Sequence, residues 1–214
     1  MTVKIKIQSP KLFNDLRRID NAEMEILREE KIEEGLIENT VIENLTEASV
    51  KFDGCIFRNV MFINCDFSKI DMVDVKFERC DLSNCEFFGG GLYRVQFKGC
   101  KLIGSRFDEC SLKSVSFKEC LCKYSNFSFS KLKDIEFCEC DLRNAIFQEV
   151  NLKGIKFEGV NLEEGVLRGS ALKDIDFRSC EITNIDVNME DLRGGIFTTY
   201  QALELSRFLG IIIK

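Results

Sequence analysis

The sequence predicts an all-β solenoid, and three observations support this prediction. Taken every five residues from 52 to 197, the chain has 30 sites that are all apolar, and 26 of them are Leu or Phe. A second column, two residues earlier in each pentad, is small or β-branched almost throughout. Gly or Asn stands two places after the large residue in 13 of the 30 pentads. Neither the helical period of 3.6 nor the strand period of two accounts for this repeat.

Each pentad is expected to form a very short strand followed by a corner. Residues two apart on an extended chain point to the same side, so one large and one small residue of each pentad face inward. Gly and Asn tolerate the positive φ that a type II turn requires, so they indicate the corners. The three remaining residues of each pentad are expected to face outward.

The placement of Phe predicts how many corners close one coil. Sampled every 20 residues, the column from Phe57 to Phe197 is Phe at all eight sites, and the column from Leu92 to Leu192 is Leu throughout. A four-sided coil of 20 residues fits this pattern, since solenoids stack identical residues into a continuous core. Connections between parallel strands prefer the right hand. Residues 50–199 then form a right-handed parallel β-helix about 36 Å long, at ~4.8 Å per coil.

The two ends of the rod are predicted to be capped, because terminal coils expose apolar surface and unpaired strand edges. Residues 1–34 are assigned to the N-terminal cap, with a strand in VKIKIQ and a helix near 21–31. Asp20 and Glu23 are expected to form an acidic capping box for this helix. The β-helix is assigned to 35–199, with an imperfect start because the pentads at Ile37 and Ile42 are weak and Glu47 breaks the column.

Residues 200–214 are predicted to form a C-terminal α-helix and tail that cap the rod and dimerise. The helix is expected at about 199–209, ended by Gly210. This segment has more apolar residues than one cap needs, and such patches usually mark interfaces. Capping alone is the alternative to a two-fold, tail-to-tail homodimer. The dimerisation residues are predicted to be Leu203, Leu205, Phe208, Leu209, Ile211, Ile212 and Ile213.

The composition argues against several classes of function. The net charge of −6 disfavours direct nucleic-acid binding, and the absence of His removes the commonest acid–base catalyst and metal ligand. No signal peptide and no apolar run of ~20 residues is present, which predicts a cytoplasmic protein without a membrane span. Nine of the eleven Cys lie in the small inward column, where packing is favoured over disulfides or metal ligation. We therefore predict no enzyme, no cofactor and no metal site.

The outward residues are left as the candidate site. Over 50–199, the faces centred on the 62 and 67 columns carry net charges of −2 and −3, whereas the other two faces carry +1 each. A docking surface for a basic partner is therefore predicted on the acidic side, the alternative being an ordinary solvated surface. Its acidic residues are Asp66, Asp81, Glu86, Asp108, Glu109, Asp141, Glu149, Glu163, Glu164 and Asp186. Its outward aromatic residues are Phe88, Tyr124 and Phe129.

The segments CDLSN (80–84), CDLRN (140–144) and VNLKG (150–154) resemble the A(D/N)LXX signature of the pentapeptide-repeat family, whose fold is a right-handed quadrilateral β-helix. The uninterrupted rod and helical C-terminus are similar to those of the Qnr-type quinolone-resistance proteins. This resemblance implies a homodimeric partner of DNA gyrase and topoisomerase IV that mimics duplex DNA. It implies that the protein protects the enzyme from quinolones and inhibits it at higher concentration. The unbroken repeat phase departs from Qnr proteins that have projecting loops.

The charge supports mimicry of DNA only in part. A 36 Å length of B-DNA carries about 21 negative charges, whereas the two acidic faces carry a net −5. Mimicry would therefore depend on rod shape and local patches. Two alternatives remain open: a scaffold or adaptor for another protein partner, and a self-immunity protein against a gyrase-targeting toxin.

Overall fold

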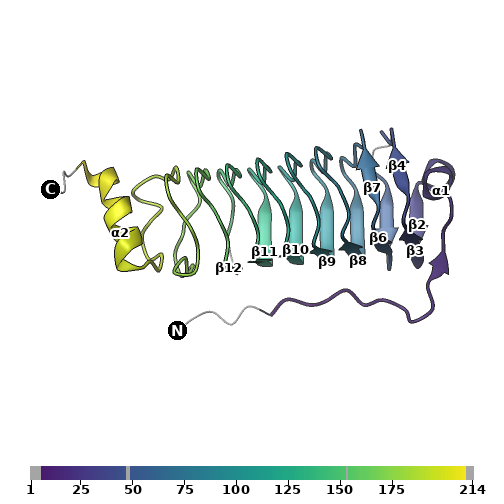
Figure 1. Cartoon of the computed structure of the whole chain (residues 1–214), viewed down its shortest axis with the longest axis horizontal. Helices are drawn as coiled ribbons and strands as arrows, with labels where there is room; N and C mark the ends of the chain where they lie inside the picture. Colours follow the sequence, from purple (N-terminus) through teal and green to yellow (C-terminus); the bar gives the residue numbers. More distant parts are fainter. Residues whose placement is uncertain (1–5, 47–48, 153, 211–214) are drawn as a thin grey trace.

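A computed structural model describes residues 6–46, 49–152 and 154–210, and it confirms the right-handed quadrilateral parallel β-helix (Figure 1). The coil length of 20 residues is confirmed by the strand register. Asp71 pairs with Gly91, Gly91 with Ser111, and Ser111 with Lys131. Each residue therefore lies directly above the residue 20 positions earlier in the chain.

The strands form one large sheet and one small sheet. The main path of the 10-stranded sheet is β1-β3-β6-β8-β9-β10-β11-β12, and β2 and β5 join it beside β8; β4 and β7 form a separate pair. The short strands are β1 (Arg17–Arg18), β2 (Lys31–Glu33), β3 (Gly35–Glu38), β4 (Val41–Glu43), β5 (Lys51–Asp53), β6 (Ile56–Arg58), β7 (Met61–Ile63) and β12 (Ile155–Glu158). The long strands are β8 (Asp71–Glu78), β9 (Gly91–Lys98), β10 (Ser111–Lys118) and β11 (Lys131–Cys138).

Two adjacent faces of the rod form regular sheet, whereas the other two consist of tight turns joined by isolated bridges, apart from the β4–β7 pair in the first coils. We call these the sheet side, containing β8 to β11, and the turn side, centred on the 62 and 67 columns. Turn-side corners close with hydrogen bonds between residues three apart, such as Cys85 N to Leu82 O at 3.1 Å and Gly90 N to Phe87 O at 2.9 Å. These N–H groups are used within their own coil, which interrupts the ladder to the next coil. The prediction of one short strand per pentad therefore holds only in part.

Every fifth residue from Gly54 to Asp174 has a positive φ, which confirms the predicted corner positions. Gly and Asn hold many of them, but Arg79, Tyr124 and Phe129 adopt the same left-handed conformation. A bulky side chain is disfavoured there, so the stacking of the coils imposes this geometry.

The core is one continuous column of buried side chains that runs from Ile19 to Leu205. Phe77, Phe97 and Phe117 stack with ring centroids 4.9 Å apart, nearly parallel. A second ladder on the opposite face includes Phe107 and Phe127, and it meets the first edge to face, with 6.0 Å between the rings of Phe107 and Phe117. The spacing of the coils thus places each ring at a favourable distance from its neighbours.

The N-terminal cap contains α1 (Ala22–Glu29), which confirms the predicted helix but not its capping box. Asn21, not Asp20, is the N-cap, and its side chain accepts a hydrogen bond from Met24 N at 3.0 Å. Glu23 accepts a hydrogen bond from Glu43 N at 2.8 Å instead. The Glu23 carboxylate therefore ties α1 to the first coil rather than closing its own helix end.

The first coil is well packed, contrary to the expectation of an imperfect start. Ile37 and Ile42 are fully buried, and so is Ile32 before them. Strand β2 already pairs with β5 in the 20-residue register. Glu47 lies outside the described residues.

The C-terminal cap begins with α2 (Thr199–Leu205), which lies across the last coil (Figure 1). The 3₁₀ helix η1 (Ser206–Leu209) follows it. Thr198 and Gln201 form a capping box. Gly210 ends the segment with a positive φ, as predicted. The helix closes the end of the core because Leu205 is buried and Phe208 packs against the core.

Residues 6–16 form an extended arm that runs along the rod from α1 towards its middle (Figure 1). Lys11 N donates to Asp74 Oδ1 at 2.7 Å, and Tyr93 contacts Gln8 at 3.4 Å. The described part of VKIKIQ, residues 6–8, is not a strand, because its backbone does not pair with the sheet. The strand prediction was therefore wrong for these residues, and the arm is held by side chains of the coils.

Candidate protein-binding surface

All ten predicted acidic residues lie on the turn side, but half of them are neutralised within the rod. Five carboxylates have ion pairs with Lys or Arg of the same or a neighbouring coil. The pairs are Asp81–Lys101, Glu86–Arg106, Asp108–Arg106, Asp141–Arg143 and Asp186–Arg168. A basic partner would have to displace these cations before it could use the paired carboxylates.

Asp108 is the least accessible of the ten. Its residue is only 6% exposed, and both carboxylate oxygens accept hydrogen bonds from Arg106, at 3.1 and 2.9 Å. Arg106 also reaches Glu86 at 3.3 Å. Asp108 is thus a structural ion-pair partner and not a free recognition group.

Asp141 is similar. Partial burial raises the pKa of its carboxyl, but hydrogen bonds from Arg143 outweigh that effect and leave the pKa below its usual value. Lys123 lies 3.4 Å away on the same carboxylate. Asp141 is therefore ionised at neutral pH, and its charge is compensated locally.

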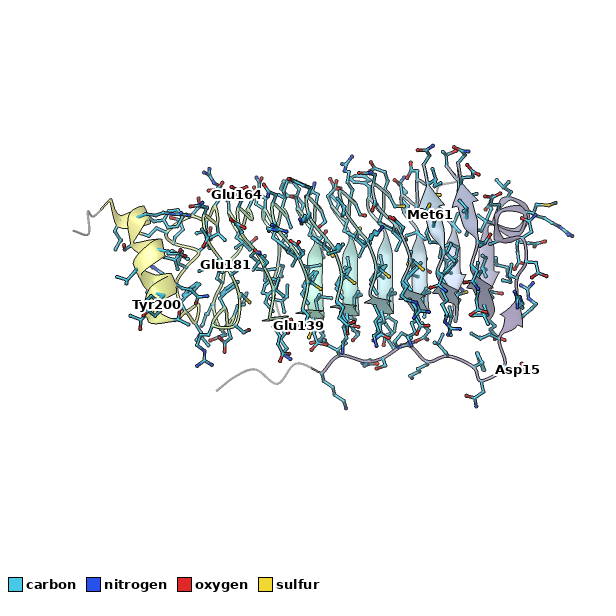
Figure 2. All side chains as sticks on the ribbon, viewed as in Figure 1. Asp15, Met61, Glu139, Glu164, Glu181 and Tyr200 are labelled. Atoms are coloured by element: carbon cyan, nitrogen blue, oxygen red, sulfur yellow. The ribbon has the colours of Figure 1, made fainter. Side chains whose placement is uncertain are left out.

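The other five acidic residues have no ion pair with any Lys or Arg that the structure describes. They are Asp66, Glu109, Glu149, Glu163 and Glu164. Three of them, Glu109, Glu149 and Glu164, stand at exposed corners with positive φ. Glu164 lies on one long edge of the rod and Glu139 of the sheet side on another (Figure 2). The free negative charge of the turn side is therefore concentrated at its corners.

Two of the three predicted aromatic residues are accessible. Tyr124 is 60% exposed and Phe129 is 52% exposed, and they occupy adjacent corners of one coil. Phe88 is half-buried. Asn126 and Ser128, small polar residues that hydrogen-bond each other at 2.6 Å, lie between the two corners.

The predicted dimerisation residues differ in exposure, because the cap buries some of them against the last coil and leaves others in solvent. Leu205 is buried and Phe208 is half-buried against the last coil, whereas Leu203 and Leu209 are about half exposed. Ile211, Ile212 and Ile213 lie outside the described residues. Tyr200, which sequence reasoning missed, is 83% exposed one turn before Leu203 (Figure 2). Its position three residues before Leu203 in a helix was the signal that could have found it.

The cysteines have a packing role. All are free, and only Cys138 is not buried. The thiol of Cys110 donates to Phe87 O at 2.8 Å, and Ser130 donates to Phe107 O at 2.6 Å in the equivalent position one coil later. Burial raises the pKa of Cys110 to about 12, so the thiol stays protonated. Among the described residues, no group of three His, Cys, Asp or Glu is placed to hold a metal ion.

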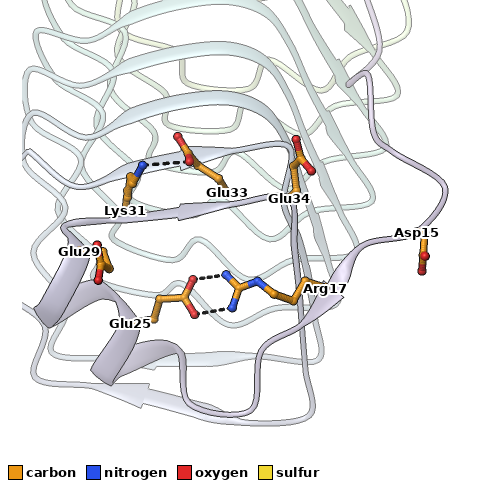
Figure 3. A pocket seen from close by; sticks show the side chains of 7 residues that line it. All are labelled: Asp15, Arg17, Glu25, Glu29, Lys31, Glu33 and Glu34. Atoms are coloured by element: carbon orange, nitrogen blue, oxygen red, sulfur yellow. Dashed lines mark hydrogen bonds and ion pairs between the residues drawn. The ribbon is translucent and has the colours of Figure 1, made fainter.

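An open pocket of about 500 Å³ lies between α1, β1 and β2 at the N-terminal end (Figure 3). Its lining is mostly acidic, and its cations are paired: Arg17 with Glu25, and Lys31 with Glu33 at 3.0 Å. The pocket therefore has no free cation among its lining residues and keeps an excess of carboxylates. No helix in the described part of the chain has the length and apolarity needed to cross a membrane.

The fold is similar to that of known proteins. A model of the pentapeptide repeat region matches residues 70–145 and 91–167, and a model of the SV2A/B/C luminal domain matches 17–107. The structure is similar to a trypsin-treated variant of QnrB1, a plasmid-mediated fluoroquinolone resistance protein, with a TM-score of 0.55 and 23% identity over 86% of this chain and 95% of that one. Full-length QnrB1 gives a TM-score of 0.53 and 21% identity over 83% and 100%.

No curated protein matches the chain significantly by sequence. At these identities, the likeness to QnrB1 is one of fold. The five-residue repeat, the coil of 20 residues and the matched repeat region together give the chain the fold of a pentapeptide-repeat protein.

Proposed function

We propose that this protein binds DNA gyrase or topoisomerase IV in the cytoplasm as a rod-shaped mimic of duplex DNA, inhibiting the enzyme and protecting it from quinolones. The observation that carries the proposal is the fold similarity to QnrB1, which extends over 95% of that resistance protein. The rod presents a row of outward side chains along its whole length, which favours binding over catalysis.

The charge distribution limits how the mimicry would work. Five of the ten predicted turn-side carboxylates are already paired with Lys or Arg, so the rod does not match the charge density of DNA. Recognition would then use the shape of the rod together with the unpaired corner carboxylates. Glu109, Glu149 and Glu164 are the groups best placed to meet a basic surface.

A homodimer through the C-terminal cap is part of the proposal. The exposed apolar side chains Tyr200, Leu203 and Leu209 lie on the cap away from the last coil, with Leu205 turned into the core. Pairing two caps would remove this apolar surface from water. Sedimentation tests the homodimer. We expect wild type to be a dimer and Leu203→Glu to be a folded monomer. A monomeric wild type contradicts the proposal.

The functional test is a gyrase assay. Purified protein at micromolar concentration is expected to inhibit DNA supercoiling and to reduce quinolone-stabilised DNA cleavage. Relaxation by a type I topoisomerase is the specificity control and should not change. If neither gyrase nor topoisomerase IV responds, the proposal is wrong.

A second candidate function is a scaffold or adaptor for another protein. The observation that favours it is the exposed apolar group on β4 and β7, where Val41, Met61 and Ile63 are between 37% and 45% exposed. Protein interfaces commonly use such a group, and this one lies apart from the unpaired corner carboxylates on which the mimicry would depend. This candidate is favoured if the gyrase assays show no effect.

A further inference from the structure

We infer that the coil carrying Tyr124 and Phe129 is the recognition element of the turn side, and that it takes a Lys- or Arg-bearing segment of a protein partner. The inference rests on the proposed function only for the identity of that partner. The chemistry of the site defines the occupant: a cation placed over an aromatic ring between two carboxylates.

The two aromatic residues are not required by the fold. Both adopt positive φ, 59° at Tyr124 and 61° at Phe129, a conformation that bulky residues disfavour. Asn144 and Gly104 hold the same corner as Tyr124 in the adjacent coils, with the same sign of φ. Both aromatic side chains are more than half exposed, so burial does not account for their presence. Lys69, Arg79 and Glu119 adopt the same conformation at other corners, so neither the fold nor burial selects an aromatic side chain here.

The neighbours of Phe129 are acidic. Glu109 and Glu149 occupy the same corner one coil before and one coil after it, and both are exposed. The stacked segments 105–109, 125–129 and 145–149 contain one cation, Arg106, against three carboxylates. Arg106 is held by Asp108, which leaves the two glutamates uncompensated by any described Lys or Arg.

Two other aromatic rings of this protein are covered by cations of the same chain. Tyr93 on the sheet side has Arg94 over its ring at 4.0 Å and Lys113 at 5.2 Å, and Phe208 has Arg207 at 4.9 Å. Within the described part of the rod, no Lys or Arg lies over the ring of Tyr124 or Phe129. Phe129 thus has the aromatic face and the negative flanks that a cationic side chain prefers, and no described Lys or Arg occupies it.

Apolar groups continue the surface into the next coils. Ile146 stacks on Asn126 through a backbone bridge, and Val166 stacks on Ile146. Both are half-buried. A segment with a Lys or Arg over Phe129 and an apolar residue over Ile146 would therefore match the surface in charge and in polarity.

The first test uses variants at the strained corner, with gyrase binding measured by surface plasmon resonance. Phe129→Asn should weaken binding about tenfold. It should leave the melting temperature unchanged or raise it by up to ~3 °C, because Asn relieves the strain. Phe129→Trp should retain binding, whereas Phe129→Leu, of similar strain but without a π face, should lose it. Equal binding by all three variants overturns the inference while leaving the proposed function standing.

The role of charge is tested with two double variants that remove the same charge at different corners. The double variant Glu109→Gln, Glu149→Gln should weaken binding and reduce its salt dependence. Glu119→Gln with Glu139→Gln makes the same charge change at the diagonally opposite corner, where both residues are also exposed with positive φ. This control pair should bind like wild type. A similar loss in both pairs would mean that net charge alone acts, which contradicts a local site.

A second probe separates the inference from the proposed function if gyrase does not bind. At low salt, an oligoarginine peptide should shift the backbone amide resonances of Tyr124 and Phe129, and an oligoglutamate peptide should not. Phe129→Asn should abolish the shift. Two results overturn the inference. One is a set of shifts confined to the acidic pocket near Glu33. The other is a change in the oligomeric state of Phe129→Asn, which would mean that a second copy of the chain occupies the site.

Discussion

The ring of Phe117 lies 4.6 Å from the ring of Phe137, centroid to centroid, and their planes are only 6° apart. The two residues are 20 positions apart, one coil, so the backbone ladder between β10 and β11 sets the separation. Each ring also meets Phe127 edge to face, at 5.9 and 5.6 Å. The rod is thus stabilised by aromatic contacts along its axis and across it.

Phe117→Ala should destabilise the protein by about 3–5 kcal/mol, because it removes a fully buried ring and leaves a cavity between two coils. Urea unfolding measures the change. Phe88→Ala, at a half-buried outward position, is the control and should cost less than about 1 kcal/mol. Equal losses in the two variants would contradict the stacked-core interpretation.

Asp108→Lys and Glu109→Lys, one residue apart, should behave differently. Asp108→Lys should lower stability by roughly 2–3 kcal/mol, since it breaks the contact with Arg106 and places a second cation beside it. Glu109→Lys should stay within about 0.5 kcal/mol of wild type, because the side chain is exposed. Thermal unfolding monitored by circular dichroism distinguishes the two. Reversing both together is therefore a poor test of partner binding.

Gln201→Leu should uncouple the C-terminal cap from the last coil. The Gln201 amide donates to the carbonyls of Phe177 and Cys180, both at 2.8 Å, and its oxygen accepts from Thr198 N at 2.8 Å. Leaving these buried groups unpaired should cost about 2–3 kcal/mol. Hydrogen exchange should rise in the last coil first. Gln148→Leu, at an exposed position, should leave the exchange pattern unchanged.

Glu78 should make stability depend on pH in the acidic range. A hydrogen bond from Lys76 lowers the pKa of its carboxyl to about 2, with burial opposing and Arg58 assisting. A carboxyl whose pKa is lowered on folding stabilises the fold at pH values above its ordinary pKa of 4.5. This contribution is lost as the pH falls towards 2. The contribution at neutral pH is on the order of 2 kcal/mol. Glu78→Gln should reduce the slope of unfolding free energy between pH 5 and about 3; an unchanged slope rejects this role.

Asp74→Ala should release the N-terminal arm. Asp74 accepts the backbone N–H of Lys11 and pairs with Arg94. Loss of a charge-assisted hydrogen bond should raise the rate of trypsin cleavage after Lys11 about tenfold, provided that the arm opens faster than it is cut. Tyr93→Phe removes only the 3.4 Å contact with Gln8 and should change the rate less than twofold. Mass spectrometry of the digest reports the site.

The five-residue repeat by itself determined the coil length, the inward columns and the corner positions. One ladder contains the Phe residues found every 20 positions from Phe57 to Phe197. They stack because the spacing of the large side chains matches the length of one coil, so only this arrangement buries all of them. The helix at each end could also be predicted, from apolar residues that no longer follow the pentads.

Only the tertiary structure decided which outward residues are free. Asp108 and Glu109 are neighbours in sequence and equally acidic, yet one is buried against Arg106 and the other is exposed. Ion pairs depend on side-chain reach and burial, which the repeat does not encode. The arm along Asp74 was likewise invisible, because its contacts join residues 63 positions apart. The conformation of Phe129 has the same origin: stacked coils impose a left-handed corner on a residue that would not choose it alone.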